Sequence, residues 1–181
     1  SQKAAYAVLQ VVVVGTLLAQ GVTDSQVVTP YTGVKFQKEQ VMQINQNITS
    51  DIKPREQLDF KLNNEIPKYW FRGDAYKTRI VDGFQLAFPE GERYFITSVR
   101  FFRDMVQDPQ LQEDIRCFIR QEGQHGLMHT AFNKVLAEQG MPVEKILKRE
   151  KGNLDKMTRQ YSPRFNLALT AAFEHFTALM A

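Results

Sequence analysis

The chain has 181 residues, of which 43% are hydrophobic and 24% are charged, a composition typical of a folded globular protein rather than a disordered or collagen-like one. Its net charge of +3 comes from 23 basic and 20 acidic residues spread along the chain. Nucleic acid, which binds to clustered positive charge, is therefore not an expected partner. Cys117 is the only cysteine, which excludes an intrachain disulfide, a zinc ribbon and a C-x-x-C redox pair.

The first segment, residues 1–22, is dominated by an apolar stretch over residues 4–22. Its length is close to the roughly 20 residues that a membrane-spanning helix needs. The same stretch also fits a secretory signal, or a buried strand or helix. Residues 23–57 are polar and predict a linker. We expect a cytoplasmic protein, which is membrane-associated if residues 4–22 form an anchor.

Residues 58–181 predict an all-α domain. Pro89 predicts the start of its first long helix, because proline is favoured in the first turn of a helix. Glu90 and Glu92 would then lie in that turn, where the helix dipole favours acidic side chains. Apolar residues at three- and four-residue steps extend this helix to Val106.

The second predicted helix begins at Asp108 and Pro109, an N-cap followed by a first-turn proline. It ends near Gln139, where Gly140 stops it. Its length places two histidines and one glutamate in the middle of the helix.

Two further helices follow. The first covers residues 143–160 and is interrupted by Gly152. The second opens at Ser162 and Pro163 with the same cap and proline, and it is still running at Ala181. We therefore expect a helical bundle that is incomplete at its C-terminus.

One face of the second helix is apolar at both ends and polar in the middle. Steps of four and three give Leu111, Ile115, Phe118, Glu122, His125, His129, Phe132 and Leu136. Burying a carboxylate without a partner costs several kcal/mol, so the polar residues need hydrogen bonds or a metal ion. One Glu-x-x-His pair is weak evidence, because such pairs are more often surface ion pairs.

Two other acids strengthen the interpretation. Glu92 continues the apolar stripe of its helix, and Glu174 lies among small and apolar residues. Di-iron and di-manganese bundles use one Glu from each of two helices and a Glu-x-x-His from each of two others. Three of these four contributions are present. The donors favour iron, with manganese and zinc as alternatives; a hydrogen-bonded network without metal is the non-catalytic alternative.

The remaining polar residues receive different roles. Glu122 and His129 are the candidate catalytic residues, and His129 is either a ligand or a neighbour of one. His175 should point to another face, and Glu90 should be a solvated acid. The chain has neither H-E-x-x-H nor G-x-S-x-G, so a zincin protease and a serine hydrolase are not expected.

Three stretches in order carry a resemblance to a known family: Phe-Pro-Glu-Gly-Glu-Arg-Tyr-Phe-Ile (88–96), Phe-Ile-Arg-Gln-Glu-Gly-Gln-His followed by His129 (118–129), and Leu-Thr-Ala-Ala-Phe-Glu-His-Phe-Thr-Ala (169–178). The sequence resembles a bacterial family of predicted metal-dependent hydrolases, which look like ferritin-type helical proteins. The resemblance spans residues 58–181, and the Trp70–Phe71 region and Ser162-Pro163-Arg164 also match it.

The resemblance implies metal ligation by Glu92, Glu122, His125 and Glu174, with His129 as an addition. The ligand pattern and the family's name together predict that water activated at a dinuclear centre hydrolyses a small-molecule substrate. The family continues into a further helix with a second E-x-x-H pair, which is not in this sequence. An oxygen-dependent di-iron oxidoreductase and a membrane-tethered helical module without catalysis remain the alternatives, and the sequence leaves open whether the protein is an oligomer.

Overall fold

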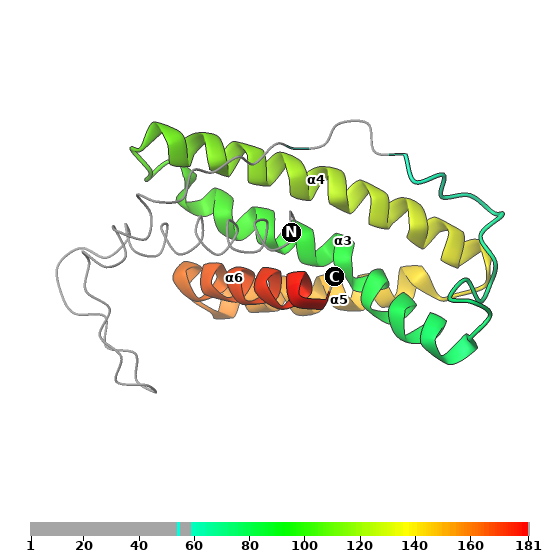
Figure 1. Cartoon of the computed structure of the whole chain (residues 1–181). Coiled ribbons are helices and arrows are strands. Elements are labelled where there is room, and N and C mark those ends of the chain that lie inside the picture. Colours follow the sequence, from blue (N-terminus) through cyan, green and yellow to red (C-terminus); the bar gives the residue numbers. More distant parts are fainter. Residues whose placement is uncertain (1–53, 55–58, 181) are drawn as a thin grey trace. The chain divides into compact units, whose positions relative to one another are not determined.

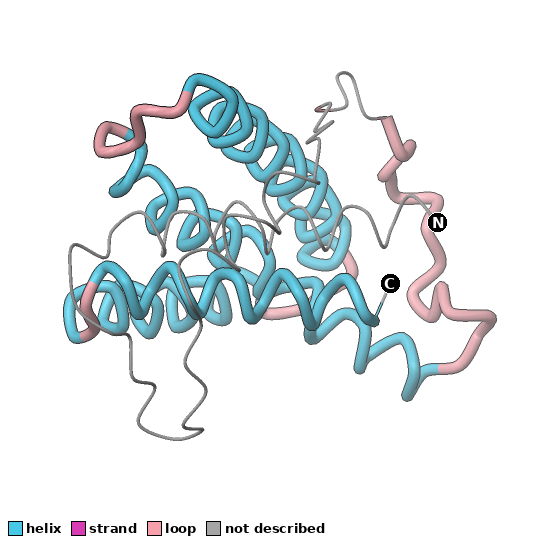
Figure 2. The backbone as a smooth tube through the Cα atoms, turned by 60° about the vertical axis from the view of Figure 1, so that its left-hand side comes forward, coloured by secondary structure: helices cyan, strands magenta, loops and turns pink. Residues whose placement is uncertain are grey.

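The computed structural model describes residue 54 and residues 59–180, and Figure 1 shows them in chain order. This part of the chain contains four helices: α3 (Ala75–Arg103), α4 (Pro109–Glu138), α5 (Val143–Gln160) and α6 (Pro163–Met180). The connections between them are loops and turns, drawn in pink in Figure 2, and no strand occurs among these residues. The prediction of an all-α fold is confirmed.

The predicted N-terminal segments are not part of this description. The apolar stretch over residues 4–22 and nearly all of the polar segment 23–57 lie outside the described residues. Among the helices that are described, none combines the length and the apolar character needed to cross a membrane. An anchor at residues 4–22 therefore stays a prediction.

Helix α3 begins at Ala75, well before the predicted start at Pro89. Asp74 is its N-cap, since its carboxylate Oδ1 accepts the backbone N–H of Lys77 at 3.0 Å. Pro89 lies in the helix interior, and Glu90 therefore lies there too and not in a first turn. The predicted start at Pro89 and the first-turn positions of Glu90 and Glu92 are wrong.

The early turns of α3 bury polar residues, which explains the error. Thr78, Asp82 and Leu86 follow one another at four-residue steps and are all buried, with Thr78 and Asp82 at 0% exposure. Asp82 accepts hydrogen bonds from the indole Nε1 of Trp70 at 3.0 Å and from the guanidinium of Arg79 at 2.6 Å. The buried side of these turns carries hydrogen-bonded polar residues instead of regularly spaced apolar ones. A prediction based on apolar spacing therefore misses the first part of the helix.

Helix α4 has the predicted limits. The carboxylate of Asp108 accepts the backbone N–H of Leu111 at 2.7 Å, as an N-cap does. At the other end Gly140 has a φ of +90°, and the N–H of Met141 reaches back to the carbonyl of Leu136 at 3.0 Å. This is a Schellman cap, which favours glycine because of the positive φ.

Helix α5 is continuous through Gly152, so the predicted interruption is wrong. A single glycine costs about 1 kcal/mol in a helix. An ion pair between Lys151 and Asp155 spans the glycine with 2.6 Å between its charged atoms. Helix α6 begins as predicted, with the hydroxyl of Ser162 accepting the backbone N–H of Phe165 at 3.2 Å.

The chain divides into two compact units. We call the unit formed by Pro54–Thr97 and Ile119–Tyr161 the Glu92 unit. The other, whose described parts are residues 98–118 and 162–180, we call the Glu174 unit. Each unit has its own buried residues.

The core of the Glu92 unit brings α3, α4 and α5 together. It contains Leu86, Leu136 and Val143, packed against Phe132, Met141, Ile146 and Leu147. The Arg93 guanidinium on α3 also pairs with Asp155 on α5 at 2.7 Å. In the Glu174 unit the buried hydrophobic residues are Val99, Phe102, Val106, Leu111, Ile115, Phe118 and Leu167.

Candidate metal centre

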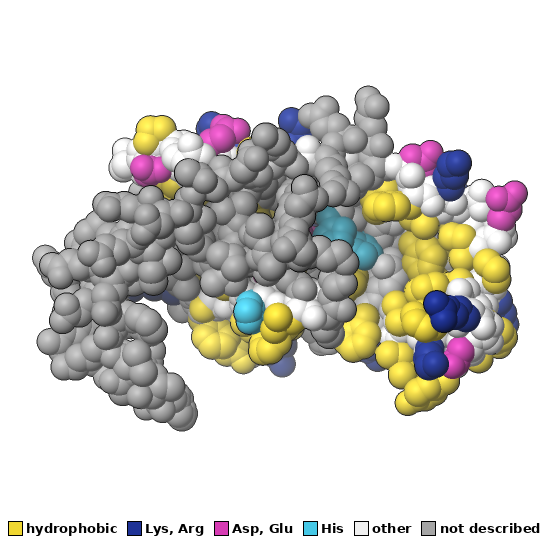
Figure 3. Space-filling model, in the orientation of Figure 1, with side chains coloured by type: hydrophobic (Ala, Val, Ile, Leu, Met, Phe, Trp, Pro, Cys, Tyr) yellow, Lys and Arg dark blue, Asp and Glu magenta, His cyan; other side chains and the backbone are white. Residues whose placement is uncertain are grey.

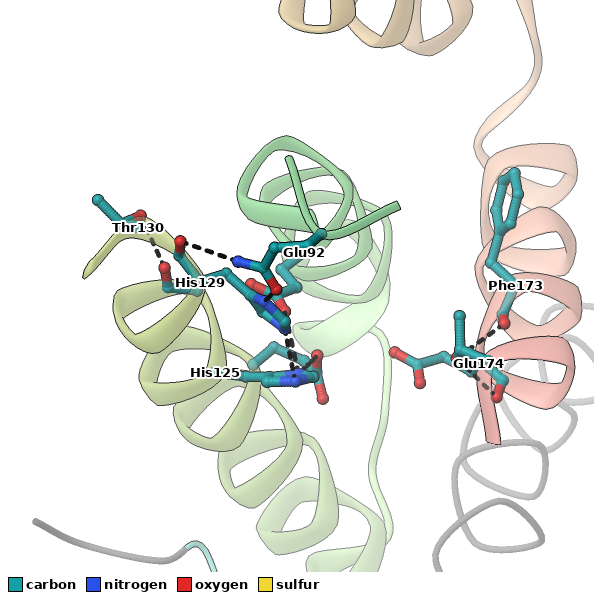
Figure 4. Close-up of polar contacts among 10 residues, drawn as sticks. Glu92, His125, His129, Thr130, Phe173 and Glu174 are labelled. Atoms are coloured by element: carbon teal, nitrogen blue, oxygen red, sulfur yellow. Dashed lines mark hydrogen bonds and ion pairs between the residues drawn. The ribbon is translucent and has the colours of Figure 1, made fainter. Parts of the chain in front are cut away.

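Three side chains of the Glu92 unit converge on one point between α3 and α4. Glu92 comes from α3, and His125 and His129 come from successive turns of α4, which places both rings on one face of that helix. Figure 4 shows the carboxylate and the two imidazoles turned toward one another. One potential ligand atom from each residue lies within 4.8 Å of the other two.

The distances within this group are short. Glu92 Oε1 lies 3.0 Å from His125 Nδ1 and 3.4 Å from His129 Nε2. The two histidines also meet, with 2.9 Å between their Nε2 atoms. The carboxylate oxygen of Glu92 and the imidazole nitrogens of His125 and His129 therefore lie close enough for one cation to contact all three residues.

The Glu92 carboxylate is buried, and only one of its two oxygens, Oε1, pairs with neighbouring side chains. Its side chain is 4% exposed, and its Oε2 has no hydrogen-bond partner among the described residues. Burial raises the pKa of Glu92, and the nearby His125 only partly opposes this. An ionised carboxylate in such a place needs positive charge beside it. The His125 ring lies 3.0 Å from Oε1 and can supply that charge to this oxygen, whereas Oε2 is left for a bound cation.

The close approach of α4 at Gly126 makes this position of Glu92 sterically accessible. A Cβ built on Gly126 would lie 2.8 Å from Glu92 Oε2, closer than real Cβ contacts come. Gly126 therefore leaves the space that the carboxylate occupies. A buried carboxylate with an unbonded oxygen, held next to two imidazoles, fits a divalent metal ion.

His125 is the most accessible member of the group. Its side chain is 55% exposed, and Figure 3 shows histidine atoms at the surface of the face that it draws. Burial by itself would lower the pKa of His125, but the contacts and charges of Glu122 and Glu92 outweigh it and raise the pKa to about 10. At neutral pH the protein therefore holds a proton on His125, beside two carboxylates.

His129 has the opposite protonation state. Burial, with a smaller contribution from the positive charge of His125, lowers the pKa of His129 to about 3. Its ring packs against Phe88, with the ring centroids 4.7 Å apart. A neutral imidazole keeps one nitrogen lone pair, as a metal ligand must.

Glu122 lies next to the group. Its Oε2 is 3.7 Å from His125 Nδ1, and the residue is buried. At this position Glu122 acts together with Glu92 to raise the pKa of His125.

The structure places the other predicted residues elsewhere. Glu174 is buried on α6 in the Glu174 unit and is not a member of the group of three. His175 is exposed, as expected. Glu90, expected to be a solvated acid, is only 18% exposed and forms an ion pair with Arg93 at 2.7 Å.

Three neighbours of the site were not predicted from the sequence: Gln85, Phe88 and Gly126. Gln85 hydrogen-bonds both the ring and the backbone of His129. Gln85 lies seven residues before Glu92, a spacing that puts both on one face of a continuous helix. A helix that begins at Pro89 would not contain Gln85, so the predicted helix does not place Gln85 and Glu92 on the same face.

The types of ligand atom in the group of three are shared with two classes of metalloenzyme. One carboxylate and two imidazoles are the protein ligands of several zinc hydrolases. They are also the ligands of non-haem iron oxygenases. Both classes keep other coordination positions for water or substrate.

Comparison with known proteins adds one finding. A family model described as a predicted metal-dependent hydrolase matches residues 53–181. No curated protein and no solved structure gives a match. The matched range contains Glu92, His125 and His129 and all four described helices.

Proposed function

The chain belongs to the family of predicted metal-dependent hydrolases, and from this premise we propose that it hydrolyses a small-molecule substrate with a divalent metal ion held by Glu92, His125 and His129. The observation that carries the proposal is that the imidazoles of His125 and His129 meet the buried carboxylate of Glu92. A metal ion bound there would lower the pKa of a water molecule and polarise the bond to be cleaved.

The residues of the chain have separate roles in this proposal. Glu92 supplies the buried negative charge that attracts the cation. His129 is already neutral and needs no deprotonation, whereas His125 must give up its proton before it can bind. The exposed edge of His125 is the side from which a substrate can approach.

Glu122 is proposed as the proton acceptor. A hydrolase with two histidines and one glutamate as ligands uses a further carboxylate as the general base. Glu122 is a buried carboxylate beside the ligands, 3.7 Å from His125 Nδ1. Its distance from the group of three is consistent with proton transfer rather than direct ligation.

We propose iron as the first candidate for the ion, with manganese and zinc as the others that these donors bind. A dinuclear centre is the alternative form of this proposal, in which Glu122 would be a ligand of the second ion instead of the general base. The ratio of metal to protein separates one ion from two.

The second candidate function is an oxygen-dependent oxidoreductase. It is favoured by the same observation, because two histidines and one carboxylate are the ligand set of non-haem iron oxygenases. Consumption of dioxygen by the reduced, iron-loaded protein would support it and count against hydrolysis.

The hydrolytic proposal is tested by turnover of a panel of small esters, amides and phosphate esters. The metal-loaded protein should cleave at least one class, and chelation should abolish the activity. Glu122→Gln should lower the rate by about 10²–10⁴-fold, the usual contribution of a general base, while metal still binds. Equal rates in the loaded and chelated protein would refute the proposal.

A further inference from the structure

Gln85, on α3, forms two hydrogen bonds with His129 on α4. Its side-chain Nε2 donates to the backbone carbonyl of His129 at 3.2 Å. Its Oε1 makes a short hydrogen bond with Nδ1 of the same residue. One amide therefore holds both the backbone and the ring of His129, and all of these atoms belong to the Glu92 unit.

The backbone carbonyl determines which way the amide points. A carbonyl oxygen only accepts hydrogen bonds, so the NH₂ group of Gln85 must face it. The Oε1 atom must then face the ring. Since an amide oxygen also only accepts, the ring nitrogen opposite it, His129 Nδ1, must carry the hydrogen.

The position of that hydrogen determines the role of the other ring nitrogen. A neutral imidazole carries one N–H, so a hydrogen on Nδ1 leaves the lone pair on Nε2. Nε2 is the atom that lies 3.4 Å from Glu92 Oε1 and 2.9 Å from His125 Nε2. The lone pair is thus directed at Glu92 and His125, the other two members of the group.

We propose that Gln85 is a positioning residue for His129, which sets the Nδ1–H tautomer and aims the Nε2 lone pair at the metal position. The proposal rests on the proposed metal site and deepens it. Histidine ligands in metalloproteins are commonly oriented by such a partner on the second ring nitrogen.

Packing alone does not account for this orientation. The ring of Phe88 lies against His129 with 4.7 Å between the ring centroids. Phe88 restricts the tilt of the imidazole, but it offers no acceptor and does not distinguish Nδ1–H from Nε2–H. The tautomer depends on Gln85.

Variants of Gln85 separate its two hydrogen bonds. Gln85→Leu removes both. Gln85→Glu keeps an acceptor for His129 Nδ1 but loses the donor to the backbone carbonyl. The matched control is Gln139→Leu, which removes a hydrogen bond of 2.9 Å to the carbonyl of Ile66 in the same unit. Gln85→Asn, too short to reach both atoms, repeats the test if the leucine variant does not fold.

The first measurement is the ring nitrogen NMR spectrum of His129 in the metal-free protein at neutral pH. The wild type, Gln85→Glu and Gln139→Leu should show the Nδ1–H tautomer. Gln85→Leu should lose it in favour of Nε2–H. This measurement does not require that the protein bind metal.

The second measurement is the dissociation constant for Zn²⁺ and Fe²⁺. Gln85→Leu should weaken binding by about 10- to 100-fold, the usual effect of removing such a partner. Gln85→Glu should recover most of the affinity, and Gln139→Leu should match the wild type.

The two measurements distinguish the inference from the function on which it rests. An unchanged Nδ1–H tautomer in Gln85→Leu, or its loss in Gln85→Glu, would overturn the positioning role. The expected tautomer change in a protein that binds no metal would uphold the effect of Gln85 on the ring and refute the metal site.

Discussion

The contact between Gly126 and Glu92 allows metal binding to be separated from stability. Gly126 and Gly123 both lie inside α4. A Cβ at Gly123 would meet no atom within 4 Å, whereas a Cβ at Gly126 would lie 2.8 Å from Glu92 Oε2. Gly123→Ala is therefore the matched control for Gly126→Ala.

The structure gives the size of the expected effects. Alanine is favoured over glycine in a helix by about 1 kcal/mol, so Gly123→Ala should raise the free energy of unfolding by about that amount. In Gly126→Ala, Glu92 Oε2 must move by 0.6 Å to restore an ordinary contact of 3.4 Å. Rotation of a flexible side chain costs little, so the stability should stay within about 1 kcal/mol of the wild type.

The same movement should be costly for metal binding. Metal–ligand distances in proteins are held to within about 0.2 Å, and Oε1 must turn together with Oε2. We therefore expect Gly126→Ala to weaken metal binding at least about tenfold, which corresponds to about 1.4 kcal/mol. Denaturant unfolding gives the stability, and competition with a chromophoric chelator gives the dissociation constant. Equal affinity in the two alanine variants would refute the assignment of Glu92 as a ligand.

Two other predictions follow from the protonation of His125 and from the buried Asp82. Because the pKa of His125 is raised to about 10, metal uptake at neutral pH should release about one proton from it, and affinity should rise as pH increases toward that pKa. Calorimetry in buffers of different ionisation enthalpy measures this release, and heats that do not depend on the buffer would contradict it. Trp70→Phe removes the indole N–H from the buried carboxylate of Asp82 and should lower the free energy of unfolding by about 1–3 kcal/mol. Urea titration would show this, and an unchanged midpoint would mean that Arg79 alone satisfies Asp82.

The helix limits that sequence predicts correctly are those fixed by local chemistry. The N-cap at Asp108, the positive-φ glycine at Gly140 and the cap at Ser162 act on residues close to them in the chain. The beginning of α3 differs, because Thr78 and Asp82 are buried and accept hydrogen bonds from Phe71 and Trp70 in the segment before the helix. Those contacts cannot be read from hydrophobic periodicity.

The candidate site divides in the same way. Helical spacing places His125 and His129 on one face of α4, and the apolar stripe of its own helix singles out Glu92. The roles of Gln85 and Gly126 depend on how α3 packs against α4. No pattern within either segment contains that information, because a glutamine or a glycine in a helix has many other uses.

The measurement that tests the metal site most directly is the metal content of the purified protein, determined by mass spectrometry of the elements. The wild type should hold at least one iron, manganese or zinc ion per chain, and Glu92→Gln should lose it. Glu90→Gln is the control, because Glu90 lies two residues away on α3 and pairs with Arg93 without being a member of the group of three. A wild-type protein that holds no such metal and takes up none after purification, or a Glu92→Gln variant that holds as much as Glu90→Gln, would contradict the assignment.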